Sequence, residues 1–154
     1  MHKFYYIVLI CGLGLACNSS NRPVGFAAID YQTEIIIPTP PASTASVRVD
    51  SASWKPLFLG LAFDAYIEVE GRYSLCFYNP SNQGLTLRYD LRFFDAETFL
   101  VDVFNPFNLP LHLPSQTSQC IDAEFFIRAD NLHQAETLAR MQVTIQIDTT
   151  ATVP

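Results

Sequence analysis

An alternation of apolar and polar residues runs along most of this chain, and it constrains the fold more than any other feature. It is clearest from Leu85 to Phe94, where the odd positions carry Leu, Tyr or Phe and the even positions from Thr86 to Arg92 are polar. Successive side chains of a β-strand point to opposite faces of the sheet, so a period of two predicts a strand with one buried face.

The same pattern recurs along the chain and predicts an all-β domain. The chain has 154 residues, 49% of them hydrophobic and 16% charged, which leaves room for one domain. Asn131–Ala139 alone favours a helix, and Asn79–Gly84 has the proline and glycine of a turn. About seven strands at this spacing predict an immunoglobulin-like β-sandwich with one short helix near the C-terminus. The other predicted strands are a long or bent segment or strand pair over 57–69 with its bend at Gly60, then Tyr73–Tyr78, Phe99–Phe104, Leu109–Leu113, Gln119–Ile127 and Met141–Ile147.

The N-terminus has the pattern of an export signal. Phe4–Leu15 is an apolar run of twelve residues, whereas a helix needs roughly 20 to span a bilayer. The following Ala16-Cys17 completes a stretch, Leu13 to Cys17, that resembles the lipobox of bacterial lipoproteins. That resemblance implies that Cys17 is acylated and becomes the new N-terminus. Secretory cleavage that leaves Cys17 as a free thiol is the alternative.

Composition shifts divide the rest of the chain. Pro38–Ser46 is rich in Pro, Ser and Thr, and it reads as an extended spacer rather than a packed element. The segment 31–37 alternates and could be either an edge strand or part of the tether. The expected organisation is a signal peptide over 1–16, a lipid-anchored tether over 17–46, a β-sandwich over 47–148 and a tail over 149–154.

Charge and histidine spacing exclude several classes of function. Nine Lys and Arg against fifteen Asp and Glu give a formal net charge of -6, which argues against nucleic acid as a partner. His112 and His133 stand apart from any second His or Cys pair, so zinc-site spacing is absent. We expect no metal, cofactor or small-molecule ligand, and His112 as a solvent-facing or hydrogen-bonded strand residue.

The acidic residues raise the question of a glycosidase, which needs two carboxylates across a cleft. Glu68 with Glu70, and Asp122 with Glu124, each share a strand face. Outward alternation accounts for both pairs. Asp95 stands at a corner, where we expect it to bond backbone N–H groups in a turn. We therefore expect no catalytic residues.

Aromatic residues outside the core pattern are the candidate partner contacts. Tyr78, Phe94 and Phe126 fall on the otherwise polar faces of their strands, and Phe104 and Phe107 belong to an aromatic, proline-rich connection. Exposed patches of this kind often mark partner sites. The alternative is that strand ends fold over the edge of the sandwich and bury these rings.

Several stretches resemble the YcfL-like lipoproteins, which are small envelope proteins of bacteria with an immunoglobulin-like sandwich. The resemblance covers about Val47 to Ile147 and implies an envelope location and a fold, with no activity. Some members are encoded beside lipoproteins that activate cell-wall synthases, which links the family to envelope biogenesis by association. The family usually has a glycine soon after the Asp-Ala corner, where this chain has Glu97-Thr98. The stretches that carry it are Phe77–Asn79, Leu87–Ala96, Leu113–Ser115, Ala129–Ala135 and Arg140–Ile147.

The cysteines add a test of geometry. Once Cys11 leaves with the signal peptide and Cys17 is acylated, Cys76 and Cys120 remain as an even pair. Alternation places both on the outward face of their strands. The immunoglobulin-like order implied by the resemblance makes these the second and fifth strands, which are neighbours in one sheet, and a bridge across its outer face is then possible. Two unpaired outward cysteines are the alternative.

Taken as a whole, these features predict an outer-membrane lipoprotein that faces the periplasm and acts as a binding or assembly module. Its expected partners are the membrane, through the lipid, and another envelope protein. The alternatives are a type VI secretion-like sandwich lipoprotein and a cell-wall hydrolase.

Overall fold

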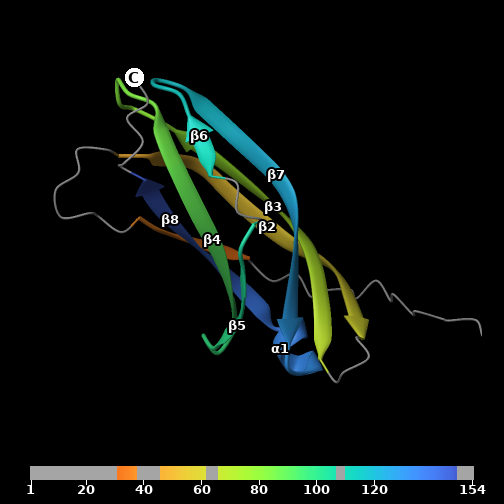
Figure 1. Ribbon diagram of the computed structural model, residues 1–154. Coiled ribbons are helices and arrows are strands. Elements are labelled where there is room, and N and C mark those ends of the chain that lie inside the picture. The colour runs from red at the N-terminus through yellow and green to blue at the C-terminus, as the bar shows by residue number, and fades with distance from the viewer. Residues whose placement is uncertain (1–30, 38–45, 62–65, 107–109, 149–154) are drawn as a thin grey trace, which may run out of the picture.

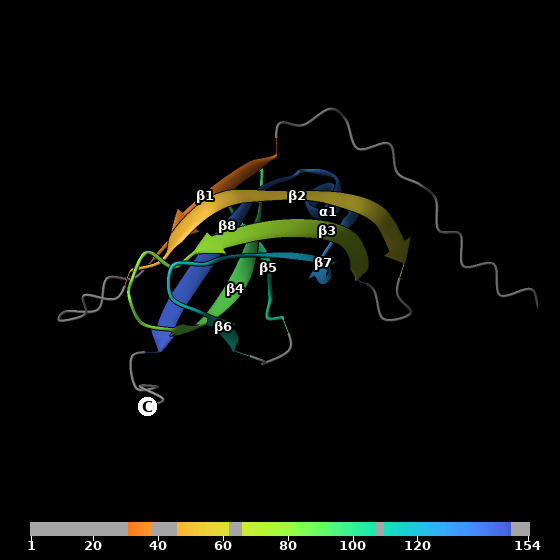
Figure 2. The ribbon, with the colours of Figure 1, turned by 90° about the horizontal axis from the view of Figure 1, so that it is seen from above.

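The computed structural model describes residues 31–37, 46–61, 66–106 and 110–148. They form an all-β sandwich of two sheets with one short helix, as predicted (Figures 1 and 2). The predicted signal peptide, Cys17, Phe107, most of the tether and the tail lie outside the described residues. In chain order the elements are β1 (Gln32–Ile36), β2 (Arg48–Leu61), β3 (Ile67–Tyr78), β4 (Leu85–Asp95), β5 (Leu100–Phe104), β6 (Leu111–Leu113), β7 (Ser118–Ala129), α1 (Leu132–Glu136) and β8 (Leu138–Asp148).

The strand order follows that of an immunoglobulin sandwich in five strands. The smaller sheet runs β2-β3-β7, and the larger runs β1-β8-β4-β5, with β6 also paired to β4. Thus β2, β3 and β7 occupy the places of the first, second and fifth strands, and β4 and β8 those of the third and sixth. The place of the seventh strand is filled by β1, which pairs with β8 in parallel.

The segment 31–37, left open by the sequence, is therefore an edge strand of the larger sheet. Its odd residues are half-buried and its even residues exposed. Trp54 of the smaller sheet donates its indole N–H to the carbonyl of Gln32, 3.0 Å away. Glu34 accepts hydrogen bonds from Arg140 (3.2 Å) and Gln142 (3.1 Å) of β8. The sheet thus extends into the part of the chain predicted as tether.

The predicted segment 57–69 and the predicted start of the next strand at Tyr73 need correction. The strand β2 ends at Leu61, and β3 runs unbroken from Ile67 to Tyr78. The irregularity is not at Gly60, because the register of β2 on β3 shifts between Val49 and Ser51 and again between Pro56 and Phe58. Each shift inserts one residue and reverses the inward parity, which is why even-numbered Trp54 and Pro56 are buried in a chain whose core is otherwise mostly odd.

The helix is also shorter than the predicted span Asn131–Ala139. It covers Leu132–Glu136, and the side chain of Asn131 caps it by accepting a hydrogen bond from the Gln134 N–H at 3.0 Å. The strand β8 then begins at Leu138, whose side chain is fully buried. Leu138 and Ala139, which were predicted as helical, therefore belong to β8.

Aromatic rings from both sheets meet in the core. Phe93 and Phe125 lie with ring centroids 4.4 Å apart, and Trp54 packs on them at 5.3 and 6.1 Å. Tyr31, which precedes β1, also packs on Trp54, with ring centroids 4.9 Å apart. These ring contacts join the two sheets, and those of Trp54 link the start of β1 in the larger sheet to the smaller sheet.

Candidate functional site

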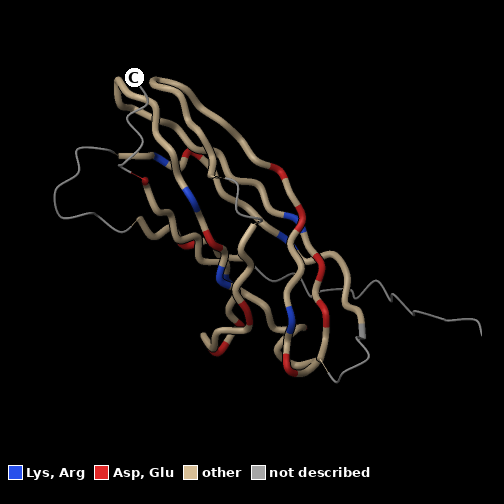
Figure 3. Tube along the Cα trace, in the orientation of Figure 1, with Lys and Arg blue, Asp and Glu red and all other residues tan. Residues whose placement is uncertain are grey.

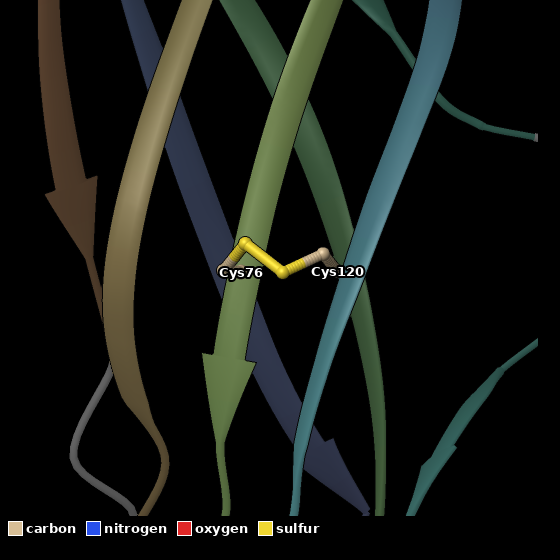
Figure 4. The surroundings of a disulfide bond; sticks show 2 residues. All are labelled: Cys76 and Cys120. Carbon is tan, nitrogen blue, oxygen red and sulfur yellow. A yellow bond between two sulfur atoms is a disulfide. The ribbon is translucent and has the colours of Figure 1, made fainter.

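A disulfide lies on the outer face of the smaller sheet. Cys76 in β3 and Cys120 in β7 are direct partners in the antiparallel register, with Cα atoms 4.0 Å apart (Figure 4). Their neighbours Leu75 and Phe77 point into the core and are fully buried. The predicted cross-strand bridge is thus present between the second and fifth strands of the immunoglobulin-like order.

Three further rows of side chains cross the same outer face beside the bridge. Phe58 and Phe126 are 42% and 51% exposed and belong to one row with Glu70 between them. Arg72 and Glu124 form an ion pair of 3.2 Å in which both side chains are exposed, so it contributes little stability. The rows are Ser53–Ser74–Asp122, Lys55–Arg72–Glu124 and Phe58–Glu70–Phe126.

The predicted aromatic contacts do not form one surface. Tyr78 is on this face but at its far end, under the guanidinium of Arg48 at 4.7 Å. Phe94 is on the larger sheet and is covered by Arg140 at 4.3 Å. These two rings are half-buried rather than free.

Phe104 is half-buried and packs against the core, with its ring 6.3 Å from that of Tyr73, as in the alternative of rings that strand ends bury. Phe126 keeps the exposure predicted for it. Phe58 is an exposed aromatic that the sequence reasoning missed. Its even position between Leu57 and Leu59, two residues of the predicted core face, was the signal that could have found it.

A hollow of about 470 Å³ opens at the edge of β4 that faces away from β8, over the stretch between its pairings with β6 and β5. Among the described residues β6 pairs with β4 up to Leu87, and β5 pairs with it from Leu91. The hydroxyls of Tyr73 and Tyr89 meet at this hollow, 3.0 Å apart, and so link the two sheets. Burial raises the pKa of both phenols, so each stays protonated and donates or accepts hydrogen bonds rather than acting as a base.

The predicted turn at Asp95 is confirmed. Its buried carboxylate accepts a hydrogen bond from the Phe99 N–H at 2.8 Å. Thr98 has a φ of 69°, in the left-handed region that favours glycine. Thr98 therefore holds a backbone conformation at this corner that glycine adopts more readily.

No group of three His, Cys, Asp or Glu side chains in the described ranges is arranged to hold a metal ion. His112 is exposed on β6, as expected, and His133 lies 3.6 Å from Glu97. Within the same ranges, no helix has the length and apolar character needed to cross a membrane.

Among known proteins, the chain has a distant likeness to a solved structure. No family model matches the chain, and no curated protein matches it. The crystal structure of Campylobacter jejuni cj0090 is similar with a TM-score of 0.35 and 14% sequence identity, covering 75% of this chain and 98% of that one. The description of the fold therefore rests on the strand order of this chain itself.

Proposed function

We propose that this chain is an exported lipoprotein of the bacterial envelope, anchored through Cys17, whose sandwich serves as a binding or assembly module rather than an enzyme. The Cys76–Cys120 bridge is the observation that supports export, because disulfides persist in oxidising compartments. It also occupies both cysteines of the sandwich. Cys17 is then the one cysteine of the mature chain left for acylation.

The resemblance to the YcfL-like lipoproteins supports the same location. In this proposal the protein resides on the outer membrane and faces the periplasm. Its part in envelope biogenesis is to present the sandwich to a second envelope protein.

The outer face of the smaller sheet is the surface that we assign to this partner. Phe58 and Phe126 expose apolar rings on either side of Glu70, next to the exposed pair of Arg72 and Glu124. Aromatic residues and Arg are enriched at protein interfaces. Such a mixture suits a protein partner better than an apolar ligand.

Two experiments test the proposal. Labelling with a palmitate analogue is expected to mark the wild type and to fail on Cys17→Ser, which moves to the soluble fraction; labelling that survives the substitution refutes the lipid anchor. A photo-crosslinking phenylalanine analogue at position 126 is expected to capture an envelope protein in native membranes. The same analogue at Gln146, an exposed residue of the larger sheet, is the control. Equal capture from both positions contradicts the assigned face.

A further inference from the structure

Three of the most exposed large apolar side chains lie in or beside two neighbouring connections. Phe99 is 67% exposed, and Leu100 and Leu132 are each 50% exposed. The first two follow the turn between β4 and β5, and the third opens α1. Exposed apolar residues that gather in one place mark an interaction surface.

These connections form one end of the sandwich, which we call the α1 end. Glu97 of the turn lies 3.6 Å from His133 of α1. Asp95, the last residue of β4, pairs with Leu138, the first residue of β8. Both views place the turn and α1 at the same end of the molecule (Figures 1 and 2).

The polypeptide enters the sandwich at this same end. One row across the larger sheet joins Gln32 to Arg140, Arg140 to Phe94, and Phe94 to Leu100. Since Gln32 is the first residue of β1, the N-terminal side of the chain arrives beside the exposed apolar residues. The opposite end is about 35 Å away along β4, whose eleven residues rise about 3.3 Å each.

The number of residues between Cys17 and Tyr31 limits how far the sandwich can lie from its anchor. Residues 18–30 number thirteen, and a fully extended chain covers at most about 3.6 Å per residue, or roughly 47 Å. Because the chain from Cys17 joins the sandwich at the α1 end, this end reaches the bilayer directly. The opposite end reaches it only if the sandwich turns over and residues 18–30 span its length of about 35 Å.

We propose that the α1 end rests on the bilayer surface, with Phe99, Leu100 and Leu132 inserted at the level of the lipid headgroups. This inference rests on the proposed lipid anchor. Acyl chains and an apolar protein surface are two separate membrane signals, and together they fix orientation as well as attachment. Acidic residues also mark the turn and α1 (Figure 3), among them Glu97 and Glu136, so the surface suits zwitterionic lipid and not anionic lipid.

A fluorescent dye on one introduced cysteine measures whether the α1 end contacts the bilayer. With Cys17 acylated and Cys76 bridged to Cys120, Ala96→Cys supplies the one free thiol of the mature full-length protein. The acylated protein is inserted into phosphatidylethanolamine–phosphatidylcholine vesicles that contain a lipid with a nitroxide quencher on its headgroup. The dye on Ala96→Cys is expected to lose emission, and a dye on Gln83→Cys at the opposite end is expected to keep it. Equal quenching at the two positions overturns the proposal.

Serine substitutions separate this contact from the tether. Phe99→Ser, Leu100→Ser and Leu132→Ser combined are expected to restore emission at position 96, while the protein stays on the vesicles through its lipid. Phe58→Ser with Phe126→Ser removes apolar rings from the other surface and is expected to leave the quenching unchanged. Self-quenching between labelled copies without quenching by the lipid assigns the α1 end to a second copy and overturns the proposal.

Acylation of Cys17 is measured in a separate experiment. The intact mass of each purified variant shows whether Cys17 carries acyl chains. An unmodified mass refutes the proposed lipoprotein, whereas an acylated protein whose position 96 escapes quenching refutes the orientation alone.

Discussion

Gly71 lies directly opposite Phe125 in the smaller sheet, and the phenyl ring occupies the space that a β-carbon at position 71 would need. The same space is bounded on its other side by the main-chain oxygen of Lys55. The glycine therefore lets an aromatic side chain lie over the backbone of β3 in the core.

Substituting this glycine is expected to destabilise the fold. Gly71→Ala forces the Phe125 ring away from Trp54 and Phe93, and overpacking of this kind costs about 1–3 kcal/mol in the free energy of unfolding. Urea denaturation measures it. Gly60→Ala is the matched control, since among the residues that the structure describes its added carbon meets only the Glu68 Cβ, at 3.9 Å. A loss as large for Gly60→Ala as for Gly71→Ala contradicts this account.

The disulfide is expected to contribute a large part of the stability. Cys76 and Cys120 are 44 residues apart in sequence, and closing a loop of that length is worth about 4 kcal/mol in the chain-entropy model. The double variant Cys76→Ser/Cys120→Ser should lose about that much free energy of unfolding and so unfold at a lower urea concentration. Addition of a reductant should lower the midpoint of the wild type and leave that of the double variant unchanged.

Asn79 is expected to be the most sensitive polar residue of the fold. Its buried amide nitrogen lies 2.7 Å from the carbonyl oxygen of Gln83 and 3.0 Å from those of Leu113 and Pro114. Asn79→Ala leaves these carbonyls without their donor, at a cost of about 1–3 kcal/mol.

Asn79→Asp keeps the shape but sets acceptor against acceptor, so it should be at least as damaging as the alanine. Thermal unfolding ranks the variants. Asn82→Ala, exposed in the same turn, serves as the control and should change stability by no more than about 0.5 kcal/mol. An Asn79→Asp protein as stable as the wild type would be incompatible with the donor role of the amide.

The paired hydroxyls of Tyr73 and Tyr89 are expected to behave as a unit. Either single Phe substitution leaves a partly buried hydroxyl without its partner and should cost about 1 kcal/mol, whereas the double substitution removes both and should cost less than the sum. A double-mutant cycle on urea unfolding measures the coupling. Strict additivity would show that the 3.0 Å contact adds nothing to stability.

The same pair predicts loss of stability in alkali. Folding raises the pKa of Tyr73 and Tyr89 above the ordinary value of 10.0, chiefly through burial. The unfolded chain therefore gives up these protons first, so their contribution is complete below pH 10 and declines as the pH rises above it. Unfolding midpoints measured from pH 8 upward should fall less steeply for the double Phe variant than for the wild type. Parallel curves would exclude these tyrosines as the cause.

Local patterns predicted most of the strands because each depends on neighbouring residues. The alternation from Leu85 to Phe94 places the buried face of β4 correctly, and parity alone sets Cys76 and Cys120 outward. The predictions are wrong where residues distant in the sequence determine the structure. A strand was predicted to begin at Tyr73, yet β3 already includes Gly71, whose missing β-carbon leaves room for the ring of Phe125, 54 positions later.

The position of β1 was also beyond local reasoning. Whether 31–37 pairs with anything depends on β8, more than a hundred residues away, and on Trp54, which the two register shifts of β2 turn inward. At the candidate site, too, some features follow from the local sequence and others from distant residues. Exposure of Phe126 follows from its own strand, whereas the cover over Phe94 comes from Arg140 of a neighbouring strand.

The parallel pairing of β1 with β8 also sets how the sandwich bears mechanical load. A pull on the chain ahead of Tyr31 acts along the axis of β1, because this strand starts at the α1 end and points away from it. Its five register pairs with β8, from Gln32↔Arg140 to Ile36↔Thr144, are then loaded together in shear. If the end of β8 is held, the two points of load lie at opposite ends of this parallel pair. In an antiparallel pair they would lie at the same end, and the bonds would break one at a time, so the parallel entry of β1 favours a domain that withstands tension on its N-terminus.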